Sequence, residues 1–158
     1  MEAWLAASPR ESPLQMSIVM SMINLGSSAS NVKWGECLSK KVYDVAQGTS
    51  VPNPPLVGNN VVLNLDIVFN VVVEIKAILV NVQFTAQGST SPITLYQQDM
   101  AATNPGTYSP GDEFVDSVSW LIPSFAPLGH YAASISVHGN DQKVDNFACL
   151  TADFDISG

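Results

Sequence analysis

The feature that most constrains the fold is a long alternation of apolar and polar side chains in the middle of the chain. Residues 59–84 read NNVVLNLDIVFNVVVEIKAILVNVQF. Side chains of a β-strand point alternately to opposite faces, so this period of two is typical of half-buried strands. The apolar set consists of Leu63, Leu65, Ile67, Phe69, Val71, Val73, Ile75, Ile78, Val80, Val82 and Phe84. The enrichment in valine and isoleucine favours sheet over helix.

Proline and glycine divide the rest of the chain into short segments. Three prolines in VPNPPLVG (residues 51–58) enforce a turning connection before the alternating block. The next tract, residues 86–113, is polar and carries Asn-Pro-Gly and Pro-Gly turn signals. We predict at most one short strand in it, around residues 93–96. Strand character resumes further on, and about seven modest strands without a convincing long helix predict an all-β fold, an antiparallel β-sandwich.

Length and charge narrow the class of protein. With 158 residues the chain is long enough for one domain with a proper core. Its formal charge of −8 and its scattered lysines exclude nucleic acid as an expected partner, because phosphate binding needs clustered cations. A membrane span needs roughly 20 consecutive apolar residues. The most hydrophobic region is interrupted by Asn64, Asp66, Asn70, Glu74 and Lys76.

The first thirty residues differ from the remainder. Arg10 precedes a short Met-rich apolar patch at residues 16–26, and the small residues SSAS follow at 27–30. This order is that of a weak secretory signal peptide. The alternatives are a disordered leader or a wrongly assembled N-terminus. In each case we expect residues 1–30 to lie outside the folded domain, which then spans residues 31–158.

The chain has two cysteines, Cys37 near the start of this domain and Cys149 near its end. Neither has a cysteine or histidine neighbour at a zinc-ligand spacing, so we predict no metal site. In a secreted protein such a pair would form a bridge between the first and last strands, worth roughly 4 to 5 kcal/mol by loop closure. The alternative is a pair of unrelated reduced thiols in the core.

Candidate catalytic groups are present but poorly arranged. Acidic residues cluster in GDEFVD (residues 111–116) and ADFDI (152–156), and paired carboxylates can hydrolyse glycosides. The second cluster lies on the predicted solvent face of a strand, so solvation explains it. His130 and His138 have no accompanying Gly-x-Ser-x-Gly elbow, and Cys37 has no identifiable base. We therefore predict no enzymatic activity and no cofactor.

Four stretches together resemble the ML lipid-recognition domain family. They are KWGEC (residues 33–37), VPNPPLVGNNVVLNLDI (51–67), IPSFAPLGHYAASISV (122–137) and ACLTADFDI (148–156). The most specific element is the C-terminal module, which runs from a proline-containing loop through Gly-x-Tyr and an alternating strand to a cysteine and a last alternating strand. The family includes the Niemann-Pick type C lumenal cholesterol carrier, the mite group 2 allergens and phosphatidylglycerol/phosphatidylinositol transfer proteins.

The resemblance implies an immunoglobulin-like sandwich whose two sheets hold a lipid between them. It also implies a disulfide between Cys37 and Cys149, because the first and last cysteines pair in this family. The polar tract departs from the family pattern. Relatives carry two cysteines there, in a motif resembling DLC...CP..G, whereas this chain reads DMAATNPGTYSPGD at residues 99–112. Without these cysteines, the middle loop is expected to be less restrained.

The function implied is reversible binding and transfer of a sterol or phospholipid by a monomer in a secreted or endolysosomal compartment, with transient contact at membrane surfaces. Each buried methylene would contribute about 0.8 kcal/mol. The expected lipid-binding residues are Leu65, Ile67, Val73, Ile78, Val80, Val82, Phe84, Trp120, Phe125, Tyr131, Ile135, Val137 and Phe154. The alternative role for each of these residues is ordinary core packing. The alternative function for the whole chain is that of an immunoglobulin-like adhesion or immune-recognition module with a filled core.

Overall fold

The structure, a computed structural model, describes residues 27–141 and 145–158. Residues 1–26 of the expected leader therefore lie outside the described residues. Residues 28–30, also expected outside the folded domain, are part of it, because Ser28 and Ala29 pair with the last strand and the amide of Ser30 donates to the carbonyl of Asp155. The regular elements of the described ranges are β1 (Ser28–Ala29), β2 (Lys33–Glu36), β3 (Tyr43–Val51), β4 (Asn60–Phe69), β5 (Val73–Ala86), β6 (Ile93–Tyr108), β7 (Glu113–Leu121), β8 (Gly129–His138) and β9 (Asn146–Ser157). Across these ranges there is no helix with the length and apolar character of a membrane span.

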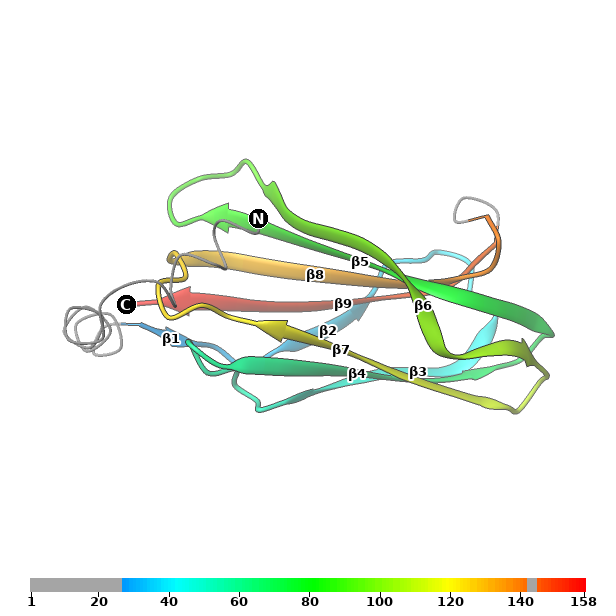
Figure 1. Cartoon of the computed structure of the whole chain (residues 1–158). Helices are drawn as coiled ribbons and strands as arrows, with labels where there is room; N and C mark the ends of the chain where they lie inside the picture. The colour runs from blue at the N-terminus through cyan, green and yellow to red at the C-terminus, as the bar shows by residue number, and fades with distance from the viewer. Residues whose placement is uncertain (1–26, 142–144) are drawn as a thin grey trace.

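The strands form two sheets that pack face to face (Figure 1). Sheet A has the order β1-β9-β8-β5-β6, with β2 also paired to β9, and sheet B has the order β3-β4-β7. The strand pairs in the described chain are all antiparallel. The prediction of an all-β, immunoglobulin-like antiparallel sandwich is confirmed.

The alternating block of the sequence builds the core between the sheets. Leu65, Ile67 and Phe69 on β4 are completely covered. On β5 every second side chain is apolar and buried up to Ile75, and the alternation starts again one residue late, at Ile78. The shift coincides with a change of register in the ladder between β5 and β6. Both apolar sets of β5 therefore face sheet B, as the two separate alternations predicted.

The structure differs from the prediction mainly at the sheet edges. Val71 is exposed, because it lies in the turn between β4 and β5 rather than on a strand. The polar tract predicted to hold one short strand at residues 93–96 instead forms the 16-residue strand β6. β3, which was not predicted, also lies at a sheet edge. Edge strands have one unpaired side and more exposed side chains, so a polar sequence suits them.

The cysteines form the disulfide that the resemblance implied. Cys37 follows β2 directly, and Cys149 lies within β9. The amide of Cys37 also donates a hydrogen bond to the carbonyl of Cys149, at 2.9 Å. Together these bonds fix the end of β2 on sheet A.

Candidate functional site

An apolar pocket of about 160 Å³ lies between the two sheets, where β6 of sheet A faces β7 of sheet B. Its lining residues are Leu63, Val80, Val82, Tyr96, Val118, Ser119, Trp120 and Leu121. Inward-facing side chains of β4, β5 and β7 form the wall. Because β7 is an edge strand, its outward-facing residues Ser119 and Leu121 also reach the pocket and form part of the rim.

The structure brings some of the expected lipid-binding residues together at this pocket. Val80, Val82 and Trp120 line it. Phe125 is half-buried in the loop between β7 and β8 and is not among its lining residues. The others are buried between the sheets outside the pocket lining: Leu65, Ile67, Val73, Ile78, Phe84, Tyr131, Ile135, Val137 and Phe154.

Sequence reasoning missed several pocket residues. Leu63 and Val118 follow the same alternation as the chosen residues, so this signal was available for both. Tyr96 and Ser119 gave no such signal. Their position depends on two edge strands of different sheets facing each other, which no local pattern encodes.

Aromatic rings close the core beside the pocket. The ring centroid of Trp120 lies 6.0 Å from that of Tyr131 and 6.1 Å from that of Phe154. Tyr131 stacks on Phe154 at 5.5 Å and lies 4.8 Å from Phe84. Burial raises the pKa of Tyr131, so its phenol remains protonated and donates a 2.6 Å hydrogen bond to the carbonyl of Pro127. This bond ties the first residues of β8 to the preceding proline loop.

Gly129, the first residue of the Gly-x-Tyr element, permits this arrangement. Its φ is +150°, and a Cβ atom there would lie 2.3 Å from the carbonyl oxygen of Thr85 and 2.7 Å from Cε1 of Phe84. Side chains are therefore excluded where β8 begins to pair with β5. The proline-stiffened loop and this glycine together set the direction in which β8 enters the sheet.

Trp120 contributes a polar group to an otherwise apolar wall. Its indole Nε1 is buried and has no hydrogen-bond partner among the described residues. Leaving a buried donor unsatisfied costs roughly 1 to 3 kcal/mol. An oxygen atom on a molecule entering the pocket could accept this hydrogen bond.

Asp116 lies on the inner face of β7, between Phe114 and Val118, and only 5% of it is exposed. Its carboxylate accepts hydrogen bonds from the amide and the hydroxyl of Thr103 on β6, at 3.0 and 2.8 Å. Asp112, by contrast, is exposed. The two acids are not buried together, so this cluster does not form a catalytic carboxylate pair. The described residues also include no group of three or more metal-ligating side chains suited to a metal ion.

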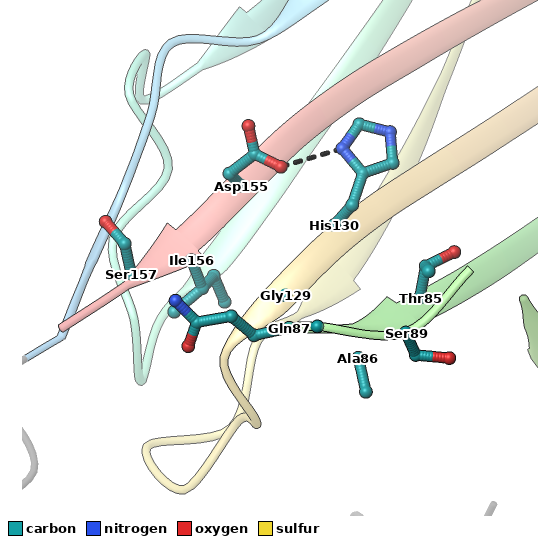
Figure 2. Close-up of a pocket in the computed structure, with 10 residues that line it drawn as sticks. Thr85, Ala86, Gln87, Ser89, Gly129, His130, Asp155, Ile156 and Ser157 are labelled. Carbon is teal, nitrogen blue, oxygen red and sulfur yellow. Dashed lines mark hydrogen bonds and ion pairs between the residues drawn. The ribbon is translucent and has the colours of Figure 1, made fainter. Parts of the chain in front are cut away.

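Two larger cavities formed by described residues lie elsewhere on the surface. One, of about 290 Å³, lies at an end of sheet A (Figure 2). There Nδ1 of His130 is 2.8 Å from Oδ1 of Asp155, and hydroxyl and amide side chains line much of the remainder. This hollow is more open and less apolar than the smaller pocket between the sheets, so it suits an apolar ligand less well.

The other cavity, of about 190 Å³, lies at the opposite edge of the sandwich, between β2 and β3. There the ring of Trp34 covers Gly48 so closely that a Cβ atom on Gly48 would lie 2.2 Å from the ring. Trp34 therefore packs across this edge, from sheet A onto sheet B.

No family model matches the sequence. The chain is 30% identical over 109 residues to the "Putative phosphatidylglycerol/phosphatidylinositol transfer protein" of Dictyostelium discoideum, a match that covers 69% of this chain and 73% of the relative. Two solved structures with low sequence identity are also similar. They are chicken MD-1 complexed with lipid IVa (TM-score 0.48, 11% identity, 83% of this chain and 97% of that chain) and a Niemann-Pick type C2 protein from Japanese carpenter ant (TM-score 0.40, 10% identity, 81% and 90%).

A disulfide-linked immunoglobulin-like sandwich with an apolar pocket between its sheets defines a class of intersheet binding domains. The identity to the Dictyostelium protein places this chain within that class: it belongs to the ML lipid-recognition domain family.

Proposed function

We propose that the sandwich formed by β1 to β9 is a lipid-binding domain that holds the hydrocarbon part of a sterol or phospholipid and transfers it, without a catalytic step. The observation that carries this proposal is the apolar pocket between the facing edges of the two sheets. Burial of each methylene of a lipid tail there gains about 0.8 kcal/mol. The alternative function, an adhesion module, requires a filled core, and the pocket favours lipid binding instead.

The size of the pocket indicates how a lipid enters. Pockets that enclose whole ligands measure about 300 to 1,000 Å³, and a cavity of about 150 Å³ accommodates a molecule the size of benzene. At about 160 Å³, this pocket matches only the end of a tail. A longer tail therefore requires β6 and β7 to move apart. These strands belong to different sheets and share no backbone ladder, so their separation breaks no sheet pairing.

Polar groups near the pocket favour a lipid that carries oxygen atoms. The unsatisfied Nε1 of Trp120 can donate to a carbonyl or hydroxyl oxygen. Tyr96 and Ser119 add hydroxyl groups to the lining, and the hydroxyl of Tyr96 donates to Oε1 of Gln98. A few polar groups in an apolar pocket commonly orient a ligand. We infer that an ester or a sterol binds better than a plain hydrocarbon.

The compartment and assembly are part of the same proposal. Disulfides persist in oxidising compartments, and Cys37 and Cys149 are bonded in this structure. This bond supports a secreted or endolysosomal lumenal protein. We infer that the lipid carrier is a monomer.

One end of the sandwich is suited to transient contact with a membrane surface. Three loops meet there, residues 52–59, 87–92 and 122–128, and none of them contains an acidic or basic residue. Gly58 donates to the carbonyl of Ile122, and Gln87 donates to the carbonyl of Leu128. We refer to these loops as the uncharged end. Leu56, Leu121 and Leu128 are exposed at or beside it, and Leu121 is also part of the pocket rim.

Filling the pocket tests the proposal. Val118 lies in the wall, whereas Val115 lies on the opposite face of the same strand and is 50% exposed. After incubation with mixed liposomes, native mass spectrometry should find lipid on the wild type and on the control V115F. The phenyl ring of V118F would occupy the space that the end of a lipid tail fills, so V118F should bind lipid about tenfold more weakly. A wild-type protein that stays ligand-free with every lipid would overturn the proposal.

A further inference from the structure

A segment of β6 leaves sheet A and crosses toward β7. Ile75 pairs with Gly106 and Ala77 pairs with Ala101, so residues 102–105 have no partner on β5. We refer to residues 102–105 as the strap. Figure 1 shows β6 bending out of sheet A toward β7 in this region.

A buried carboxylate ties the strap to sheet B. Asp116 occupies a position on β7 that alternation reserves for an apolar side chain. A buried charge is expensive unless it is hydrogen-bonded. Oδ2 of Asp116 accepts from the amide of Thr103, and Oδ1 accepts from the Thr103 hydroxyl and from the amide of Ser117. Removing the strap would leave the carboxylate with fewer partners, so Asp116 and Thr103 hold each other in place.

A second set of contacts supports the strap. The hydroxyl of Tyr108 donates a 2.7 Å hydrogen bond to the carbonyl of Asn104. The ring of Tyr108 meets Phe114 edge-on, with centroids 5.4 Å apart. In the tract where relatives carry two cysteines, this chain therefore restrains its backbone with a carboxylate and a tyrosine. The expectation of a less restrained middle loop overlooked these contacts.

The position of the strap gives it a role in the pocket. Val118 and Trp120 line the pocket and follow Asp116 on the same face of β7, and two strand residues span about 7 Å. On β5 the lining includes Val80 and Val82 but not Ile78. The pocket thus extends from Tyr96 and Trp120 to Val80 and Val118, and beyond this end lie the Ile78–Met100 pair and the strap next to Asp116.

We propose that the Asp116–Thr103 contact sets the length of hydrocarbon chain that the pocket accepts. This inference rests on the proposed lipid-binding function. With the contact intact, a chain entering past Tyr96 and Trp120 ends near Val118. When the contact is broken, the strap can leave β7, and the chain can extend past Asp116 toward Phe114.

The test uses a series of lysophosphatidylcholines of increasing acyl length and the full chain. Thr103→Val removes one hydrogen bond but keeps the amide that donates to Asp116. Asp116→Asn weakens the contact from the other side, and Thr107→Val, on the exposed part of β6 beyond the strap, is the matched control. In the wild type and the control, affinity should rise about fourfold per added methylene and then reach a plateau.

In Thr103→Val and Asp116→Asn the plateau should begin at longer chains. If Asp116→Asn fails to fold, Thr103→Val alone decides the outcome. A plateau at the same length in the variants and the wild type, or a wild-type series without any plateau, would overturn the role of the contact while lipid binding stands. If no lysolipid of any length binds to any of these proteins, the proposed function itself fails.

Discussion

At Gly129 the backbone of β8 passes so close to β5 that no side chain fits. We expect Gly129→Ala to lower the free energy of unfolding by roughly 2 to 4 kcal/mol, because a Cβ atom would collide with the Thr85 carbonyl. Gly106 is the matched control: its φ is +146°, but nothing lies within 4 Å of a Cβ atom there. Urea denaturation of both variants separates collision from backbone strain. Equal losses of unfolding free energy in Gly129→Ala and Gly106→Ala would contradict the role of the collision with the Thr85 carbonyl.

Individual residues also show how far the sequence could predict the site. Val80 and Trp120 were identified because alternation places them on the inner face of a strand. The same alternation places Asp116 inside, but it does not reveal the hydrogen bonds that make a buried acid tolerable. Thr103, which supplies two of them, lies in a strap that has left its own sheet ladder. Such a contact depends on the bend of one strand, so no sequence spacing predicts it.

The disulfide acts at the scale of an element, because β2 is a short strand of 4 residues attached to the edge of β9. The bond joins cysteines 112 positions apart. Loop-closure entropy predicts that the variant with both cysteines changed to serine is destabilised by roughly 3 to 5 kcal/mol. Denaturant unfolding of this variant, and of the wild type with and without reductant, measures the loss.

This variant should still bind lipid under conditions where it remains folded. The pocket is lined by β4, β5, β6 and β7 and uses no residue of β2 or β9. A loss of lipid affinity as large, in free energy, as the loss of stability would mean that β2 and β9 contribute to the binding site directly. That result would contradict our assignment of the pocket.

Among the elements, buried strands were far easier to predict than edge strands. β4 and β5 pack an apolar face against the opposite sheet, so their sequences alternate clearly. Most of β6 is exposed, and its sequence includes Asn104, Pro105 and Gly106, which indicate a turn in isolation. The strand forms because β5 supplies backbone partners on both sides of the strap. Tertiary pairing here overrides the local signal.

For the molecule as a whole, the uncharged end stands out against a net charge of −8. We expect the protein to associate with neutral phosphatidylcholine vesicles with little dependence on salt, because these loops carry no charged group and the nearby His130–Asp155 pair lies on β8 and β9. Leu56→Asp should weaken this association about tenfold, since burial of a leucine gains 1.5 to 3 kcal/mol. Val72→Asp at the opposite end, where Val72 is 65% exposed, is the control. If both substitutions weakened vesicle co-sedimentation equally, the proposal that the uncharged end meets the membrane would be contradicted.

The packing of Trp34 over Gly48 has a consequence for transport. In the proposed function, lipid enters between β6 and β7, and the ring of Trp34 packs across the opposite edge of the two sheets. We therefore expect a lipid to leave by the side at which it entered, so that the same rim faces the donor membrane and the acceptor membrane in turn.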